Sequence, residues 1–198
     1  MQAMRCPVCE ASTARHFTQI AGRDYWRCEA CAATFVDPTQ LPDIGVERAQ
    51  YALHHNDVAD AGYRTFLGRL TTPLLQRLRS DPPPDHTYGL HGLDYGCGPA
   101  PALAAMLREA GHAMALYDPL FCDVPAVLMN TYHFITCTEV AEHFHRPAQE
   151  FARLDRLLLP GGWLGVMTGF APDDSAFARW HYRRDPTHVV FYRAATFQ

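Results

Sequence analysis

The 198-residue chain is long enough for one full domain and a small additional module. About half of its residues (48%) are apolar and 19% are charged, which is typical of globular proteins and excludes a disordered chain. The formal net charge of −4 excludes a general attraction to nucleic acid, which would need a local basic patch. Because no apolar run reaches the length of a membrane span and no signal peptide precedes the rest, we expect a cytoplasmic protein without a membrane partner.

Residues 1–37 are turn-rich and carry two C-x-x-C pairs, eighteen residues apart. The four cysteines are Cys6, Cys9, Cys28 and Cys31. This spacing fits a zinc ion with four thiolate ligands, which would hold together a segment too small for its own core. Two disulfides or free thiols are the alternative, which a reducing compartment disfavours. We therefore expect a zinc ribbon whose metal is structural, since four protein ligands leave no open coordination position.

Residues 38–84 are expected to form an irregular connector and then a helix that caps the active site. From Tyr63 to Leu78 the apolar residues recur at helical spacing, although Pro73 should kink the helix. Tyr51 in the connector and Tyr63 in the helix are candidates for closing the site.

Strand and helix patterns alternate through residues 85–198. Strands are expected at 91–95, 113–117, 133–138 and 163–168, and helices at 102–110 and 147–159. Alternation at this spacing predicts an α/β fold with a parallel sheet covered by helices on both faces. In such sheets ligands bind beyond the carboxyl ends of the strands, so the residues that follow each strand are the functional candidates.

The first of these strands ends in a glycine-rich turn with the sequence Asp94-Tyr95-Gly96-Cys97-Gly98. Two glycines permit a sharp turn and let a ligand approach the backbone closely. The second strand ends at Asp118-Pro119, where a carboxylate can accept hydrogen bonds from both hydroxyls of a ribose. A dinucleotide site would share these features, but Pro101 stands where its fingerprint has a third glycine.

Two further motifs follow in order. The run T-E-V-A-E-H at 138–143 comes after the next strand, and L-L-P-G-G at 158–162 comes before the last. Together with the glycine turn and the second-strand acid, they resemble the class I S-adenosylmethionine-dependent methyltransferases over about residues 90–170. The resemblance implies a Rossmann-like sheet and S-adenosylmethionine as the cofactor, with Asp94 near its methionine end. The implied cofactor-binding residues are Asp94, Tyr95, Gly96, Cys97, Gly98, Asp118, Pro119, Thr138 and Glu139.

The sequence departs from the family pattern in two places. About fifteen residues separate Asp118 from Phe134, too few for a normal third strand and helix, so we expect a loop there. The adenine-binding acid of the family is then unassigned, with Asp123 as a candidate. The sequence stops at Gln198, where relatives usually add an antiparallel hairpin, so we expect a truncated sequence or a shortened sheet.

Groups suited to acid–base or metal chemistry also follow the strands. Glu139, Glu142 and His143 have the i, i+3, i+4 spacing that places side chains on one face of a helical turn. His188 lies in an aromatic-rich segment after the last strand and could join them. These two carboxylates and two imidazoles suit a second, divalent metal with open positions. Without a metal, His188 or His143 would be the general base, with Glu142 beside it.

The E-x-x-E-H motif with a later histidine is similar to the small-RNA 3′-terminal 2′-O-methyltransferases, and the motif alone also resembles the ubiquinone-pathway O-methyltransferases. Both methylate one of two neighbouring hydroxyls, which a metal could bind together. We therefore expect O-methylation of a small molecule, with or without metal assistance. The alternatives are RNA methylation at a 2′-oxygen or base, with the ribbon gripping the RNA, and methylation of carbon. RNA would need the basic patch offered by Arg179, Arg183, Arg184 and Arg193.

Overall fold

The computed structural model describes residues 4–53, 57–84 and 89–198. The chain forms two compact units that are both assembled from separate segments. Unit 1 comprises Met1–His54, Ala141–Phe151 and Thr168–Gln198, and unit 2 comprises His55–Val140 and Ala152–Met167. The sequence predicted three consecutive segments with boundaries at residues 37 and 84. The two units of the structure instead alternate along the chain. Within the described residues, no helix is both long and apolar enough to cross a bilayer.

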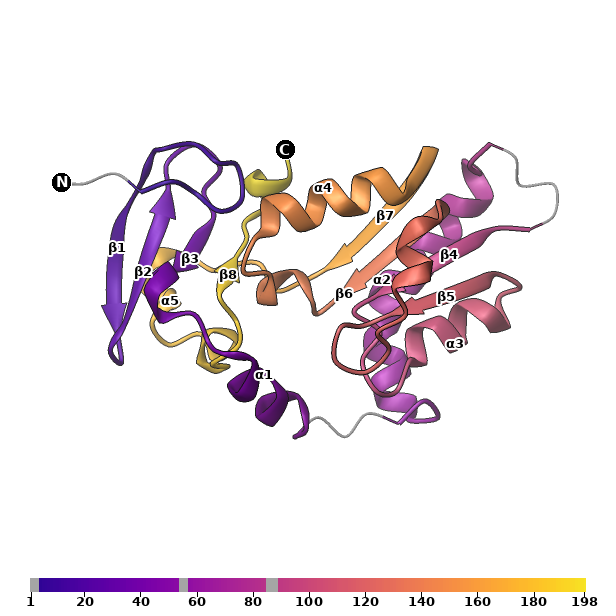
Figure 1. The fold of residues 1–198 in the computed structure, drawn as a ribbon, viewed down its shortest axis with the longest axis horizontal. Helices are drawn as coiled ribbons and strands as arrows, with labels where there is room; N and C mark the ends of the chain where they lie inside the picture. The colour runs from indigo at the N-terminus through magenta and orange to yellow at the C-terminus, as the bar shows by residue number, and fades with distance from the viewer. Residues whose placement is uncertain (1–3, 54–56, 85–88) are drawn as a thin grey trace. The chain divides into compact units, whose positions relative to one another are not determined.

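Unit 1 is built on an antiparallel sheet with the strand order β1-β2-β3-β8. Its strands are β1 (Ala14–Ile20), β2 (Arg23–Cys28), β3 (Thr34–Val36) and β8 (Val190–Phe191), and its helices and turns are η1 (Pro38–Gln40), α1 (Ile44–Tyr51), η4 (Ala141–His143), α5 (Asp174–Phe177), η5 (His181–Arg184) and η6 (Ala194–Phe197). In Figure 1 the first three strands are indigo and β8 is yellow, because β8 comes from the end of the chain. Thr34 pairs with Phe191. The predicted ribbon therefore shares its sheet with a strand that the sequence did not indicate.

Aromatic packing explains why β8 joins this sheet. The rings of Tyr25 and Phe191 both pack edge-on against Phe177, with centroids 5.3 and 5.4 Å apart. All three side chains are at most 1% exposed, so they form the core of unit 1.

The connector that precedes unit 2 is more regular than predicted. Helix α1 begins after Asp43, whose carboxylate accepts hydrogen bonds from the N–H groups of Gly45 and Val46 at 2.8 and 3.0 Å. This N-cap satisfies two backbone donors at the start of the helix. The prediction of an irregular segment is wrong here. It followed from the weak apolar periodicity of the sequence, whereas the N-cap at Asp43 starts a helix without such periodicity.

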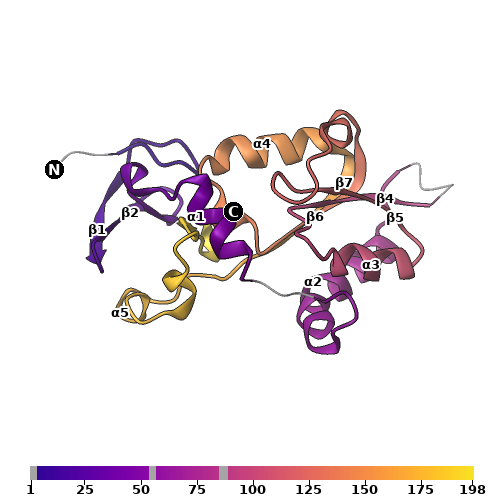
Figure 2. The same ribbon diagram turned by 60° about the horizontal axis from the view of Figure 1, so that its bottom comes forward.

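Unit 2 is built on a parallel sheet with the strand order β5-β4-β6-β7. Its elements are α2 (Ala61–Ser80), β4 (His91–Tyr95), α3 (Ala102–Glu109), β5 (Ala113–Tyr117), η3 (Pro125–Met129), β6 (Tyr132–Thr138) and β7 (Leu158–Met167), together with the second half of α4 (Pro147–Leu157). Helices α2 and α3 cover one face of the sheet and the second half of α4 covers the other (Figure 2). The predicted α/β fold with a central parallel sheet is confirmed.

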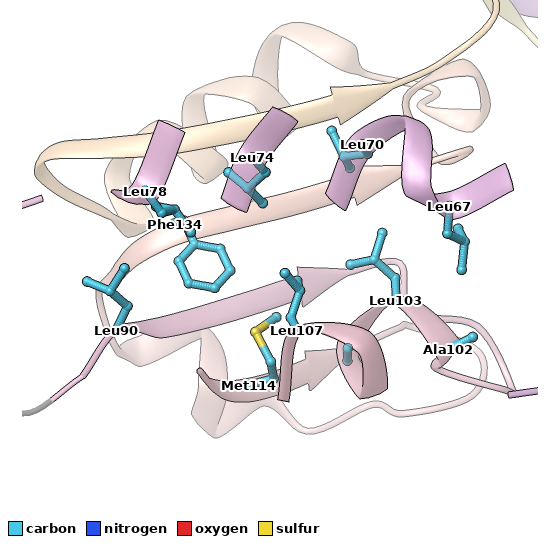
Figure 3. Packing of buried hydrophobic residues seen from close by; sticks show 11 residues of the cluster. Leu67, Leu70, Leu74, Leu78, Leu90, Ala102, Leu103, Leu107, Met114 and Phe134 are labelled. Atoms are coloured by element: carbon cyan, nitrogen blue, oxygen red, sulfur yellow. The ribbon is translucent and has the colours of Figure 1, made fainter. Parts of the chain in front are cut away.

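The core of unit 2 lies between the sheet and helices α2 and α3 (Figure 3). Its buried members are Leu67, Leu70, Leu74, Leu78, Leu90, Ala102, Leu103, Ala104, Leu107, Met114 and Phe134. A Cβ on Gly92 would lie 2.3 Å from the Phe134 ring, so this strand position requires glycine. Helix α2 runs uninterrupted through Pro73 because that residue faces solvent while the leucines on the other side are buried. Burying each leucine contributes roughly 2 kcal/mol, which offsets the lost backbone hydrogen bond.

Two further regions bear on the sequence predictions. Between β5 and β6 the chain has no strand, only an isolated bridge between Asp118 and Cys122 and the turn η3, as expected from the short spacing. Strand β7 begins at Leu158 rather than at 163 and includes Pro160. It pairs only with β6 within the described residues, and an edge strand tolerates proline because one side of its backbone has no ladder to complete.

Candidate functional site

The glycine turn after β4 adopts backbone conformations that favour glycine. Gly96 and Gly98 have φ angles of +80° and +63°. A Cβ at Gly96 would lie 2.3 Å from Cγ2 of Val140, whereas a Cβ at Gly98 would meet no atom within 4 Å. The N–H groups of Gly96 and Cys97 donate to the carbonyl of Tyr117 at 2.8 and 3.1 Å, which fixes the turn to the end of β5. The turn is therefore tightly packed on one side and open to a ligand at Gly98.

Asp118, the acid at the end of β5, holds this region together through its carboxylate. Oδ2 accepts the N–H of Gly98 at 3.0 Å, and Oδ1 accepts the N–H groups of Leu120 and Phe121 at 2.8 and 3.1 Å. A carboxylate offers about four acceptor positions, so these three bonds leave capacity for about one more donor. Pro119 beside it is exposed.

Asp94 is a buried carboxylate beneath the turn, 3% exposed. Burial raises its pKa to about 6, although the hydroxyl of Thr136 donates to Oδ1 at 2.8 Å and opposes that rise. Tyr63 of α2 lies within electrostatic reach: burial raises its pKa, and the charges of Asp94 and Glu139 raise it further. Asp94, Glu139 and Tyr63 are therefore close enough to interact electrostatically.

The remaining predicted cofactor residues differ in what their side chains offer. Oγ1 of Thr138 is buried and has no hydrogen-bond partner among the described residues. Tyr95 is buried with its hydroxyl accepting a bond from Nη1 of Arg153 at 3.0 Å. Burial raises the pKa of Cys97 to about 12, so its thiol stays protonated at neutral pH and is no nucleophile.

Glu139 does not share a helical face with the residues after it. Its φ of +52° is left-handed, its N–H donates to the carbonyl of Met167 at 2.8 Å, and the helical turn starts only at Ala141. The expected i, i+3, i+4 face is therefore not formed, because Glu139 has a non-helical backbone conformation and lies before the helical turn.

Glu142, His143 and His188 come together in unit 1. One ligand atom from each lies within 4.8 Å of the others. Glu142 is fully buried and His188 is 8% exposed. The two imidazole rings are 4.7 Å apart at an angle of 72°. Glu139, the fourth residue of the predicted metal set, is not part of this cluster.

Both histidines are fixed in the same tautomer by main-chain carbonyls. Nδ1 of His143 lies 3.1 Å from the oxygen of Thr187, and Nδ1 of His188 lies 2.7 Å from the oxygen of Tyr182. A carbonyl can only accept, so each Nδ1 carries the proton and each neutral ring has its lone pair on Nε2. Histidine ligands of metals are oriented in this way, and so are histidine bases.

The comparison with known families decides what kind of protein this is. The family model described as a methyltransferase domain matches residues 61–198, more than half of the chain. The chain belongs to the class I S-adenosylmethionine-dependent methyltransferases. A comparison with curated proteins gives no match.

The family implies S-adenosylmethionine as the methyl donor, and the strand ends of this methyltransferase fit such a cofactor. The open space at Gly98 admits a ligand, and the unpartnered Oγ1 of Thr138 can bond to one. The ionised carboxylate of Asp94 suits the ammonium group of the methionine end. The carboxylate of Asp118 keeps capacity for about one further donor, such as a ribose hydroxyl.

The four cysteines of the methyltransferase lie outside the family match, and their sulfur atoms are arranged as a metal site. Sγ of Cys6 lies 3.7 Å from Sγ of Cys31, and Sγ of Cys9 lies 3.6 Å from Sγ of Cys28. Zinc–sulfur bonds of about 2.3 Å place the corners of a tetrahedron about 3.8 Å apart, whereas a disulfide needs about 2 Å. The four thiols therefore fit zinc. The hydrogen bond between the sulfur atoms of Cys6 and Cys31 lowers the pKa of Cys6 to about 5.

The two C-x-x-C knuckles repeat one backbone arrangement. The carbonyls of Cys6 and Cys28 each accept the N–H of the residue four positions later, Glu10 and Ala32, at 3.0 Å. Glu10 and Ala32 have left-handed φ angles of 62° and 60°. The two knuckles therefore share the same turn, closed by a backbone hydrogen bond and a left-handed residue.

The sequence missed the groups that surround Glu142. Oε1 accepts the hydroxyl of Tyr182, and Oε2 accepts the hydroxyl of Thr168 at 2.8 Å. Gly169 donates its N–H to the Tyr182 hydroxyl at 3.0 Å. No sequence signal separated these residues from their neighbours, since their roles depend on contacts between η4, η5 and the segment after β7.

Proposed function

We propose that the chain is an O-methyltransferase of small molecules in which Glu142, His143 and His188 bind or deprotonate the acceptor hydroxyl. S-adenosylmethionine supplies a methyl group already activated on a sulfonium. The protein's remaining task is to hold an oxygen nucleophile in line and to accept its proton. The convergence of one carboxylate and two imidazoles, whose Nδ1 atoms face main-chain carbonyls, is the observation that carries the proposal.

The same cluster supports metal assistance. Two histidines and one carboxylate are a common ligand set for first-row divalent ions, and three protein ligands leave positions for two neighbouring hydroxyls. Ligand atoms on one such ion lie about 3 to 4 Å apart, so atoms within 4.8 Å of one another need only a small adjustment. Without a metal, the Nε2 lone pair of either histidine can accept the proton directly.

RNA as the acceptor has less support than the sequence suggested. Arg183 is buried and donates to the hydroxyl of Tyr25 and the carbonyl of Ala178. Arg193 pairs with Asp174 at 2.6 Å. Two of the four arginines of the proposed phosphate patch are therefore engaged within the protein.

The test is a calorimetric titration in two steps. S-adenosylmethionine is added first, to protein from which weakly held metals were removed by a chelator mild enough to leave the cysteine-bound zinc. Mn²⁺ follows, with the variants Glu142→Ala and His188→Ala beside the wild type. His181→Ala is the matched control, an exposed histidine on the same segment.

We expect the cofactor to bind all four proteins and Mn²⁺ to bind only wild type and His181→Ala. Methylation of a catechol should then require Mn²⁺. If the cofactor binds and Mn²⁺ does not, metal assistance is wrong and a histidine base remains. If His188→Ala and Glu142→Ala both retain full methylation, the cluster is not the acceptor site.

A further inference from the structure

We infer that Tyr182 is the positioning residue of the Glu142–His143–His188 cluster, holding Glu142 with its side chain and His188 with its backbone. The inference rests on the proposed function, because it assigns how that cluster is kept ready for a metal or a proton. All residues involved belong to unit 1.

The side-chain end of Tyr182 orients the carboxylate. Its hydroxyl donates to Oε1 of Glu142 and accepts the N–H of Gly169 at 3.0 Å. Since the N–H can only donate to the hydroxyl oxygen, the hydroxyl proton is left available for the carboxylate of Glu142. Thr168 donates to the other carboxylate oxygen at 2.8 Å, so the carboxylate plane is held from both ends.

The backbone end of Tyr182 orients the imidazole. Its carbonyl lies 2.7 Å from Nδ1 of His188, and its ring packs on that imidazole with centroids 4.2 Å apart at 51°. Tyr182 thereby orients the Glu142 carboxylate by a hydrogen bond. It also sets the tautomer of His188 through its carbonyl and the position of that imidazole by ring packing. His143 is held separately, by the carbonyl of Thr187.

Gly169 makes this position of Tyr182 possible. A Cβ there would lie 2.9 Å from Cε1 and 3.0 Å from Cζ of the Tyr182 ring. An added methyl group would push the ring, and with it the hydroxyl, away from Glu142. Gly169 is therefore required by the close approach of the tyrosine, which gives a second way to disturb the same contact.

The experiment compares Tyr182→Phe, which removes only the hydroxyl, with Gly169→Ala, which keeps the hydroxyl but displaces it. Tyr132→Phe is the matched control in unit 2, since the hydroxyl of Tyr132 also donates one hydrogen bond, to the carbonyl of Val127 at 2.7 Å. Each protein is titrated with Mn²⁺ and with S-adenosylmethionine. The ¹⁵N ring resonances of His143 and His188 are recorded across pH, and thermal unfolding verifies folding.

We expect Tyr182→Phe and Gly169→Ala to bind Mn²⁺ roughly 10- to 100-fold more weakly than wild type, as removal of supporting groups around metal ligands usually does. Cofactor affinity should be unchanged in both variants. The His188 ring resonances should shift in Gly169→Ala, which displaces the Tyr182 ring that packs on His188. Tyr132→Phe should match wild type in all of these. If wild type binds no Mn²⁺, the ring resonances alone decide, and a Gly169→Ala spectrum identical to wild type overturns the inference.

The two failures are distinguishable. The proposed function is contradicted if wild type does not bind the cofactor, or if His188→Ala retains full methylation. In either case the ring spectra still test the role of Tyr182. Wild-type Mn²⁺ affinity and wild-type ring spectra in both Tyr182→Phe and Gly169→Ala contradict the positioning role, while the proposed function stands.

Discussion

Gly98 donates its backbone N–H to Oδ2 of Asp118 at 3.0 Å, which joins the glycine turn of one strand to the acid of the next. The same carboxylate also accepts two N–H groups from its own loop. Asp118 therefore shapes the turn whether or not a cofactor is present.

Asp118→Ala should destabilise the protein as well as weaken cofactor binding. Three backbone donors lose a charged acceptor, which should lower the free energy of unfolding by about 2 kcal/mol. Urea denaturation measures this change, and titration with S-adenosylhomocysteine should show at least tenfold weaker binding. Asp155→Ala, an exposed acid on α4, is the control. A variant that binds weakly but is as stable as wild type would show that Asp118 acts on the ligand alone.

Cofactor binding should depend on the protonation of Asp94. Burial raises the pKa of Asp94 to about 6, so the folded protein takes up a proton as the pH falls through that value. A protonated Asp94 cannot attract an ammonium group, so affinity for S-adenosylhomocysteine should fall up to about tenfold per unit below pH 6. Titration from about pH 8 to about pH 5 measures this. In Asp94→Asn the affinity should be low throughout, without this pH dependence.

The same ionisation has the opposite effect on stability. The folded pKa of Asp94 lies above its ordinary value of 3.8, so the folded state binds more protons between the two values. Stability from this group is full below about pH 4 and is lost as the pH rises through about 6. A pH dependence with the reverse sign in the wild type minus Asp94→Asn difference would contradict the raised pKa of this buried carboxyl group.

Gly96→Ala should be more damaging than Gly98→Ala. Both positions have positive φ, but only at Gly96 would the new Cβ collide with Val140, at 2.3 Å. We expect Gly96→Ala to cost about 2–3 kcal/mol and Gly98→Ala about 1 kcal/mol, from backbone strain alone. Adding Val140→Ala should restore part of the loss in the first variant and none in the second. Additive effects in both pairs would contradict the packing explanation.

Each chain should hold one zinc ion through its four N-terminal cysteines. Metal analysis of protein purified without added metal should give about one zinc per chain, and Cys28→Ser should lower this ratio and destabilise unit 1. Cys137→Ser, a buried cysteine outside the cluster, should keep the zinc. A wild-type protein that retains no zinc and forms disulfides instead would refute the site.

The parallel sheet could be predicted because each of its features is local. His91–Tyr95 and Ala113–Tyr117 have the predicted bounds, since a short apolar run followed by a glycine or an acid is visible in the sequence alone. The C-x-x-C spacing is likewise local, because two cysteines three positions apart can bind one metal ion. These predictions needed no knowledge of which segments meet.

The rest depended on contacts or conformations that leave no trace in a short window of sequence. Val190–Phe191 has two residues and no periodicity, so its pairing with β3 could not be foreseen. Glu139 has a left-handed conformation that its residue type does not announce, which made the helical-face prediction wrong. Tyr182 stands among other aromatic residues, and only the structure shows that its hydroxyl meets Glu142.

Because Thr34 pairs with Phe191, strand β3 cannot complete its sheet until the residues of β8 have been synthesised. Strand β3 is synthesised early, while the strand that covers its edge emerges only after most of the chain has been translated. At typical translation rates that interval is on the order of ten seconds. During it, the edge of β3 presents unpaired backbone groups that can recruit neighbouring nascent chains. Slower translation, or crowding of ribosomes on one message, should therefore raise the fraction of misassembled protein even when the finished fold is stable.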